Sequence, residues 1–161
     1  MSRRAARLTA VEVLYGADVR GASALELLSE REDVDPYASH LVEEIHRRSA
    51  ELDALIGDHS RDWRPERMSP VDRNVLRLAT LELLEGDVPP AAVIDEAVEI
   101  AKHFSGSDAG RFVNGVLEAV RQTVGGGGSE DGGGVGRSGD GGGGATGASG
   151  DGGTASASTT A

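Results

Sequence analysis

The stretch from Pro89 to Val120 constrains the fold more than any other part of the chain. It reads PPAAVIDEAVEIAKHFSGSDAGRFVNGVLEAV, and apolar residues recur at helical spacing on both sides of Gly106. The proline pair marks the start of the first helix, because proline is tolerated in a first turn. Gly106 breaks that helix, and Ser107 can cap a second one. The short join over residues 105–108 predicts that the two helices fold back as an antiparallel pair.

The second helix of this pair is predicted to bury a single face. The residues on that face are Phe112 or Val113, Val116, Leu117 and Val120. An unusual group of polar residues and glycine lies at the junction and in the turn after it: Lys102, His103, Ser107, Asp108, Arg111, Asn114 and Gly115. We expect Asn114 and Gly115 to shape the packing of the helix, with Gly115 admitting a close neighbour.

Four further helices follow from the same periodicity. They span residues 3–15, where Gly16 loosens the end, 22–29, 36 to about 59, and 70 to just before Gly86. Leu25 and Leu28 are expected to point inward. The last of the four is apolar on so much of its circumference that we expect it at the centre of the domain. Since no segment shows the alternation of a strand, the sequence predicts an all-α bundle of six or seven helices.

The remainder of the chain differs sharply in composition. Residues 125–161 hold 17 of the 24 glycines and almost no large apolar side chain, so they cannot offset the entropy cost of ordering. The sequence therefore predicts a helical domain over residues 1–124 and a disordered tail over 125–161. Trp63, in the segment DWRPERMSP, is expected to anchor that segment onto the bundle.

Charge and composition exclude several classes of protein. The net charge is −11, of which the tail contributes −3 and residues 1–124 contribute −8, and this argues against indiscriminate nucleic-acid binding. There is no cysteine, no apolar run long enough for a membrane helix and no signal peptide. A cytoplasmic protein is the expectation.

No arrangement of residues indicates catalysis, a cofactor or a metal. His40, His46 and His59 lack the spacing of metal ligands, and no phosphate-binding glycine loop precedes a helix. We therefore expect a binding protein that is not an enzyme. Arg3, Arg4 and Arg7 form a basic cluster within about one helical turn, where positive charge opposes the helix dipole. Such a cluster is either a solvated helix start or a functional surface.

Several segments resemble the NusB family of transcription antitermination factors. They are RRAARLTAVEVLYGAD, VDRNVLRLATLELL, IDEAVEIAK and RFVNGVL, and together they cover most of residues 3–121. The resemblance implies a NusB-like helical bundle that binds boxA-type single-stranded RNA. It also implies joint action with NusE, a small-subunit ribosomal protein, and with the RNA polymerase elongation complex on ribosomal-RNA operons.

The resemblance further implies which residues contact RNA. In the family, the N-terminal arginine-rich helix and the junction before the last helix lie near each other. Carried onto this chain, the RNA-binding residues are Arg3, Arg4, Arg7, Tyr15, Lys102, Asp108, Arg111 and Phe112. Glu82 lies where the family places partner-facing or RNA-facing residues; otherwise it is a plain exposed glutamate. Phe112 can equally belong to the core.

Alternatives stay open at the level of sequence. The string RFVNGVL also occurs in the NusB-like RNA-binding domain of certain ribosomal-RNA cytosine methyltransferases, although no cofactor-binding α/β domain follows here. A helical scaffold or homodimer without RNA binding is the other alternative. Members of the family occur both as monomers and as dimers.

The composition of the tail generates a first prediction. Deleting residues 125–161 should leave the melting temperature unchanged within about 2 °C, because the tail adds almost no apolar burial. Thermal unfolding followed by far-UV circular dichroism measures this. A melting temperature several degrees lower would show that the tail stabilises the domain.

Overall fold

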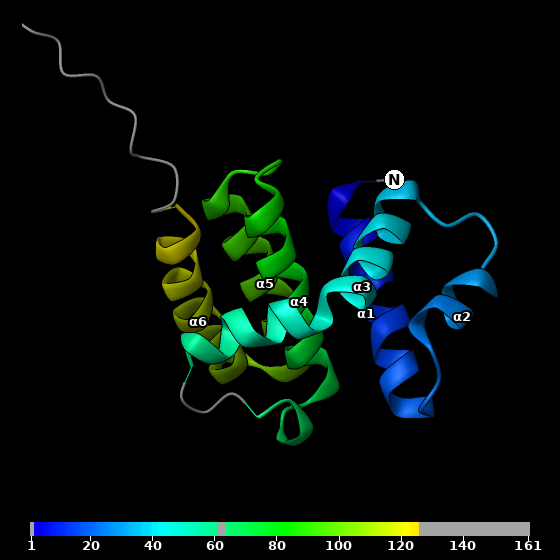
Figure 1. Cartoon of the computed structure of the whole chain (residues 1–161), viewed down its shortest axis with the longest axis horizontal. Helices are drawn as coiled ribbons and strands as arrows, with labels where there is room; N and C mark the ends of the chain where they lie inside the picture. The colour runs from blue at the N-terminus through cyan, green and yellow to red at the C-terminus, as the bar shows by residue number, and fades with distance from the viewer. Residues whose placement is uncertain (1, 61–63, 126–161) are drawn as a thin grey trace, which may run out of the picture. The chain divides into compact units, whose positions relative to one another are not determined.

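The computed structural model describes residues 2–60 and 64–125, and all the regular secondary structure in these ranges is helical. The α-helices are α1 (Arg3–Arg20), α2 (Ala24–Ser29), α3 (Pro36–Asp58), α4 (Pro70–Glu85), α5 (Pro90–Ser105) and α6 (Ser107–Gly125), with a short 3-10 helix at Pro65–Arg67 (Figure 1). The prediction of an all-α bundle is confirmed. Trp63 and the tail beyond Gly125 lie outside the described residues.

Polar caps fix where three of the helices begin. The Ser2 hydroxyl accepts a hydrogen bond from the Ala5 N–H at the start of α1, and Asp35 accepts one from the Tyr37 N–H at the start of α3. Ser69 caps α4 in the same way, because its side chain accepts a hydrogen bond from the Asp72 N–H. Each cap gives a partner to a backbone donor that would otherwise have none in the first turn.

The predicted end of the first helix near Gly16 is wrong. α1 continues to Arg20 and ends at Gly21, whose φ of 63° belongs to the left-handed region that glycine adopts readily. A Cβ built on Gly16 would lie 3.5 Å from the Leu27 side chain, so the glycine faces α2 inside a continuous helix. An internal glycine costs about 1 kcal/mol, and the buried packing of α1 on both sides of it offsets this.

α4 occupies the centre of the bundle, as predicted. It packs against α1, α3, α5 and α6. Its buried residues cover nearly every direction around the helix axis: Asn74, Val75, Leu76, Leu78, Ala79, Thr80, Leu81, Glu82 and Leu83. Three of these, Asn74, Thr80 and Glu82, have polar side chains, and Asn74 and Glu82 form hydrogen bonds to Asp18 and Arg7 of α1.

α5 and α6 form the tight pair that the sequence predicted, with a shorter join than expected. Only Gly106 separates them, and its φ of 91° favours glycine. The closest approach between the two helices falls at Gly110, where an added Cβ would lie 2.4 Å from Lys102 Cγ. The assignment of this role to Gly115 is wrong, because Gly115 is exposed and its Cβ position faces open space.

α3 links the two sides of the bundle. It begins beside α1, bends at Arg48 (φ −107°, ψ 16°) and crosses in front of α4 toward α6 (Figure 1). At its far end, His59 Nε2 lies 2.8 Å from the Thr123 hydroxyl of α6.

Of the two residues of α2 that were predicted to point inward, Leu28 does so and Leu25 does not. Ala24 is buried and Leu27 and Leu28 are half-buried, whereas Leu25 is exposed. The inward face therefore follows the spacing i, i+3, i+4 from Ala24. In the described part of the chain, no helix combines the length and the apolar character needed to cross a membrane.

Candidate nucleic-acid interface

The three N-terminal arginines of α1 occupy three different environments. The Arg7 side chain is buried, and its Nε lies 2.8 and 3.1 Å from the two carboxylate oxygens of Glu82 in α4. Arg7 is 4% exposed and Glu82 is 2% exposed. The structure therefore corrects the expectation that Arg7 and Glu82 face RNA or a partner, because each is enclosed and occupied by the other.

The half-buried Tyr37 and the exposed Arg3 extend this buried pair into a group that we call the Arg7–Glu82 cluster. The Tyr37 hydroxyl of α3 donates a hydrogen bond to Glu82 Oε1. Burial raises the pKa of the Tyr37 hydroxyl well above its ordinary value, and the bond to Glu82 raises it further, so the hydroxyl remains a donor. The Arg3 guanidinium lies 4.7 Å from the centre of the Tyr37 ring, a cation–π contact. The cluster thus joins α1, α3 and α4.

Arg4 binds α5 instead. Its Nε and a terminal nitrogen donate to the two carboxylate oxygens of Glu96 at 3.0 and 2.8 Å. These hydrogen bonds hold the pKa of the Glu96 carboxyl below its ordinary value. The Arg4 side chain stays largely exposed, so solvent screens the pair and it contributes little stability. Its geometry nevertheless places the start of α1 beside the first half of α5.

The other end of α1 lies beside the end of α5. Val11, Glu12 and Tyr15 of α1 line one groove together with Phe104 of α5 and Val71 of α4. With Arg4 opposite Glu96 and Tyr15 opposite Phe104, α1 and α5 run parallel and side by side. Tyr15 is 43% exposed and Phe104 is 46% exposed, so both rings are open to solvent.

This parallel arrangement divides the predicted RNA-binding residues into two groups. Arg4 and Tyr15 are roughly 16 Å apart along α1, at about 1.5 Å per residue. Only Tyr15 lies at the end of α1 where α5 passes into α6. Arg3 packs on Tyr37 of α3, Arg7 is buried, and Arg4 faces the middle of α5 through Glu96. Arg4 also lines a groove with His103 near the end of α5, so the expectation that α1 adjoins the junction holds for Tyr15 and Arg4 and not for Arg3 and Arg7.

The junction itself is strongly exposed. Lys102 and Arg111 each lie in a loose surface ion pair, Lys102 with Glu99 at 3.5 Å and Arg111 with Asp108 at 3.6 Å. Asp108 lies in the first turn of α6, where the helix dipole favours a carboxylate. Phe112 is half-buried and packs against the core, so its ring is less available than that of Phe104.

Phe104 is a candidate that sequence reasoning missed. Its helical position matched the apolar series of α5, which suggested a core residue. The only signal that could have separated it from the core is its place in the final turn of α5, next to the helix-breaking Gly106. At that point α5 no longer has a neighbour that covers all of its apolar face.

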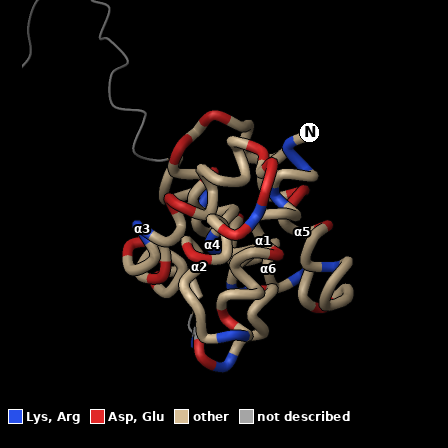
Figure 2. The backbone as a smooth tube through the Cα atoms, turned by 90° about the vertical axis from the view of Figure 1, so that its right-hand side faces the viewer, with Lys and Arg blue, Asp and Glu red and all other residues tan. Residues whose placement is uncertain are grey.

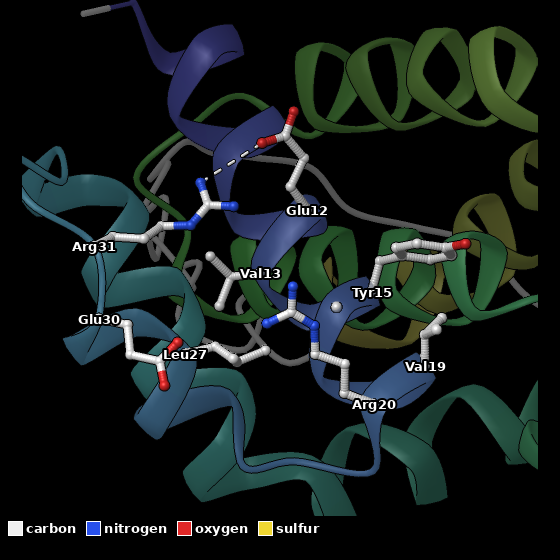
Figure 3. A pocket seen from close by; sticks show the side chains of 9 residues that line it. Glu12, Val13, Tyr15, Val19, Arg20, Leu27, Glu30 and Arg31 are labelled. Carbon is white, nitrogen blue, oxygen red and sulfur yellow. Dashed lines mark ion pairs between the residues drawn. The ribbon is translucent and has the colours of Figure 1, made fainter.

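A second groove lies on the other side of Tyr15, between α1 and α2 (Figure 3). It has a volume of about 500 Å³ and is lined by Glu12, Val13, Tyr15, Gly16, Val19, Arg20, Leu27, Glu30 and Arg31. Arg31 reaches across to Glu12 at 3.6 Å. The surface near Tyr15 is therefore flanked by guanidinium groups from α1 and from the segment after α2.

Charges of both signs are mixed along the backbone of the described part, apart from a blue basic stretch at the N-terminus (Figure 2). No group of histidine, aspartate or glutamate side chains within residues 2–60 and 64–125 is arranged to hold a metal ion. The fold and this surface define an all-helical protein with exposed aromatic and basic side chains gathered at one end of α1.

The sequence of this helical protein is similar to a known protein family and to individual members of it. The model of the NusB family matches residues 4–122. The transcription antitermination protein NusB of Saccharopolyspora erythraea is 48% identical over 127 residues, which cover 74% of this chain and 86% of that protein. NusB of Rubrobacter xylanophilus is 43% identical over 129 residues, which cover 77% of this chain and 93% of that protein.

Solved structures agree with the sequence relatives. A T. maritima NusB structure matches with a TM-score of 0.69 at 37% identity, covering 76% of this chain and 92% of that one. A chain from a crystal structure of the antitermination factors NusB and NusE in complex with dsRNA matches with a TM-score of 0.67 at 35% identity, covering 75% and 96%. This chain belongs to the NusB family.

The Arg7–Glu82 cluster generates a stability prediction. Arg7→Met should lower the free energy of unfolding by about 3–5 kcal/mol, because it leaves the Glu82 carboxylate buried without its cation. The double variant Arg7→Met/Glu82→Leu should recover most of that loss. Urea unfolding followed by circular dichroism measures both values.

Arg4→Met is the matched control, because it removes the exposed partner of Glu96. It should leave the free energy of unfolding almost unchanged. Equal effects of Arg4→Met and Arg7→Met would contradict the structural role assigned to the buried pair.

Proposed function

We propose that this protein is a transcription antitermination factor, without enzymatic activity, that binds boxA-type single-stranded RNA jointly with NusE. In this role it helps RNA polymerase to transcribe ribosomal-RNA operons processively. Support comes from the similarity to transcription antitermination proteins and to a chain from the crystal structure of NusB and NusE in complex with dsRNA. The observation that carries the proposal is the exposed surface formed by Tyr15, Lys102, Phe104 and Arg111 at the α5–α6 junction.

The side chains of this surface suit an unpaired strand. Unpaired bases stack on aromatic rings and guanidinium planes, while cations hold the phosphates. Lys102 and Arg111 are free to exchange their loose surface ion pairs for phosphates. The exposed Asp108 carboxylate repels phosphate but can accept a hydrogen bond from a base amino group, which would contribute sequence readout.

The N-terminal arginines have different parts in the proposed function. Arg4 is exposed beside α5 and lines a groove with His103, so it would meet a strand that extends from the junction along α1, whereas Arg3 is exposed next to Tyr37 of α3. Arg7 and Glu82 contribute indirectly, because their buried pair holds α1 in place. The single RNA-binding cluster expected from the sequence becomes a track along α1.

A partner is needed because the electrostatic attraction to RNA is local. The chain carries a net charge of −11, so its overall field opposes nucleic acid. A basic ribosomal protein such as NusE would be attracted to the acidic parts of the surface and would add its own contacts to the RNA. We propose that affinity for boxA is low for the protein alone and high for the pair.

The proposed function also implies where the protein acts and which residues carry the activity. We place the protein in the cytoplasm, in association with the transcribing RNA polymerase. We assign the activity to residues 1–124 and treat residues 125–161 as a separate tail. In a homodimer whose interface covered the junction, the second copy would compete with RNA for that surface. We therefore propose that RNA binds one copy of the protein at a time.

A titration of labelled boxA RNA tests the proposal. Fluorescence anisotropy with and without NusE, at matched salt, should show clearly tighter binding by the pair. A duplex of the same sequence should bind more weakly, because paired bases cannot stack on protein rings. No gain from NusE, or equal binding of duplex and single strand, would count against the proposal.

A charge reversal locates the RNA on the surface. Arg111→Glu should weaken binding on the order of tenfold and reduce the salt slope by about 0.7 for the lost phosphate contact. Arg47→Glu is the matched control, because Arg47 is an exposed arginine of α3 in a similar i, i+3 pair with Glu44. Equal losses in the two variants would indicate a general charge effect and would contradict the assigned surface.

A further inference from the structure

The described part of the chain contains four aromatic residues, and two of them meet in one surface groove. Tyr37 belongs to the Arg7–Glu82 cluster, and Phe112 packs against the core. Tyr15 and Phe104 are both more than 40% exposed and line the same groove. Phenylalanine is usually buried, so an exposed ring beside an exposed tyrosine indicates a binding surface.

The groove between these rings has the character of a slot for a flat, apolar ring. Its volume is about 370 Å³, and its lining also contains Val11 and Val71. Glu12 is the one charged residue among those that line it. A carboxylate at the edge of such a slot can accept a hydrogen bond from an amino or ring N–H group of a nucleobase.

The groove of Figure 3 adjoins this slot, because Glu12 and Tyr15 line both. Arg20 lines the Figure 3 groove and forms no ion pair or hydrogen bond with any residue that the structure describes. It lies five residues after Tyr15, which is about 7.5 Å along the helix axis. This spacing is comparable to that between a base and a neighbouring phosphate in an extended strand.

We propose that Tyr15 and Phe104 hold one unpaired base of the bound RNA in this groove, and that Arg20 binds a phosphate next to it. The inference rests on the proposed function and adds Phe104 and Arg20 to the residues that contact RNA. Phe104 supplies a stacking surface that every base can use. Glu12, which forms a loose ion pair with Arg31, favours an orientation of the base that points a donor group at its carboxylate.

The groove between Tyr15 and Phe104 is followed along the surface by the cationic side chain of Arg20. This order favours RNA over a protein as the molecule that binds the groove. A protein partner would need a continuous apolar patch, whereas Arg20 and Arg31 border the apolar residues on one side. A nucleotide presents an apolar ring and an anion one after the other, which matches the order Phe104, Tyr15, Arg20 across the surface.

Abasic scanning combined with substitution of Phe104 tests the inference. Each nucleotide of boxA RNA is replaced in turn by an abasic one, and affinity is measured in the presence of NusE. For the wild-type protein, one abasic position should weaken binding by about 5- to 150-fold through loss of stacking. The Phe104→Ala variant should bind intact RNA about 5- to 150-fold more weakly than the wild type does. An abasic nucleotide at the same position should then cause little further loss of affinity.

Conservative variants and controls separate stacking from folding. Phe104→Trp should keep most of the affinity, whereas Phe104→Leu should lose it although it stays apolar. Leu25→Ala removes an exposed apolar side chain on α2 and should leave RNA affinity unchanged. Arg20→Gln should weaken binding and lower the salt slope by about 0.7, and should leave the abasic profile unchanged.

Three outcomes would overturn the inference. Equal RNA affinity of Phe104→Ala and the wild type would overturn it while leaving the proposed function intact. Loss of NusE binding by Phe104→Ala in the absence of RNA, with RNA binding by the variant alone unchanged, would assign the groove to the protein partner instead. Absence of any RNA binding by the wild type with NusE would overturn both.

Discussion

The buried charge pair between Arg7 and Glu82 determines how the rest of the structure is arranged. An arginine and a glutamate enclosed in a helical bundle are stable only when their polar atoms are satisfied, which fixes the approach of α1 to α4. Tyr37 extends the constraint to α3. Arg4 binds Glu96 of α5 as well. α1 therefore cannot slide along α5 without leaving the buried Arg7 and Glu82 unpaired.

That position decides which part of α1 reaches the functional surface. Because α1 runs parallel to α5, its last turns approach the α5–α6 junction, and its arginine-rich start lies about three turns away. Tyr15 therefore becomes the residue of α1 closest to the junction. The abundance of arginine at the N-terminus serves partly to fix the helix, and the residues best placed to contact bases are aromatic.

Much of the fold could be predicted from the sequence, because its determinants are local. Helical spacing of apolar residues, Ser69 before Pro70, and the break at Gly106 mark their elements directly. The central place of α4 followed from its nearly continuous apolar surface. The prediction that the first helix ends near Gly16 was wrong, because this glycine faces Leu27 of α2 inside a continuous helix. The spacing of apolar residues along the sequence does not reveal that contact.

The candidate site was less predictable because it depends on contacts between distant residues. Arg7 and Glu82 are 75 positions apart, and nothing in their neighbours distinguishes them from exposed charges. Phe104 fits an apolar series and only the end of α5 leaves it uncovered. Lys102, Asp108 and Arg111 were found through family resemblance and are exposed, as a binding role requires. Gly110 was overlooked because its significance lies in the Lys102 side chain opposite it.

We propose that RNA lies against the end of α1 and the α5–α6 junction. Photo-crosslinking of thiouridine-substituted boxA RNA to the complex with NusE, followed by mass spectrometry, identifies the residues that RNA contacts. We predict crosslinks at Tyr15, at Phe104 and within residues 102–112. Crosslinks confined to α2 and α3, with none at the junction, would contradict the account.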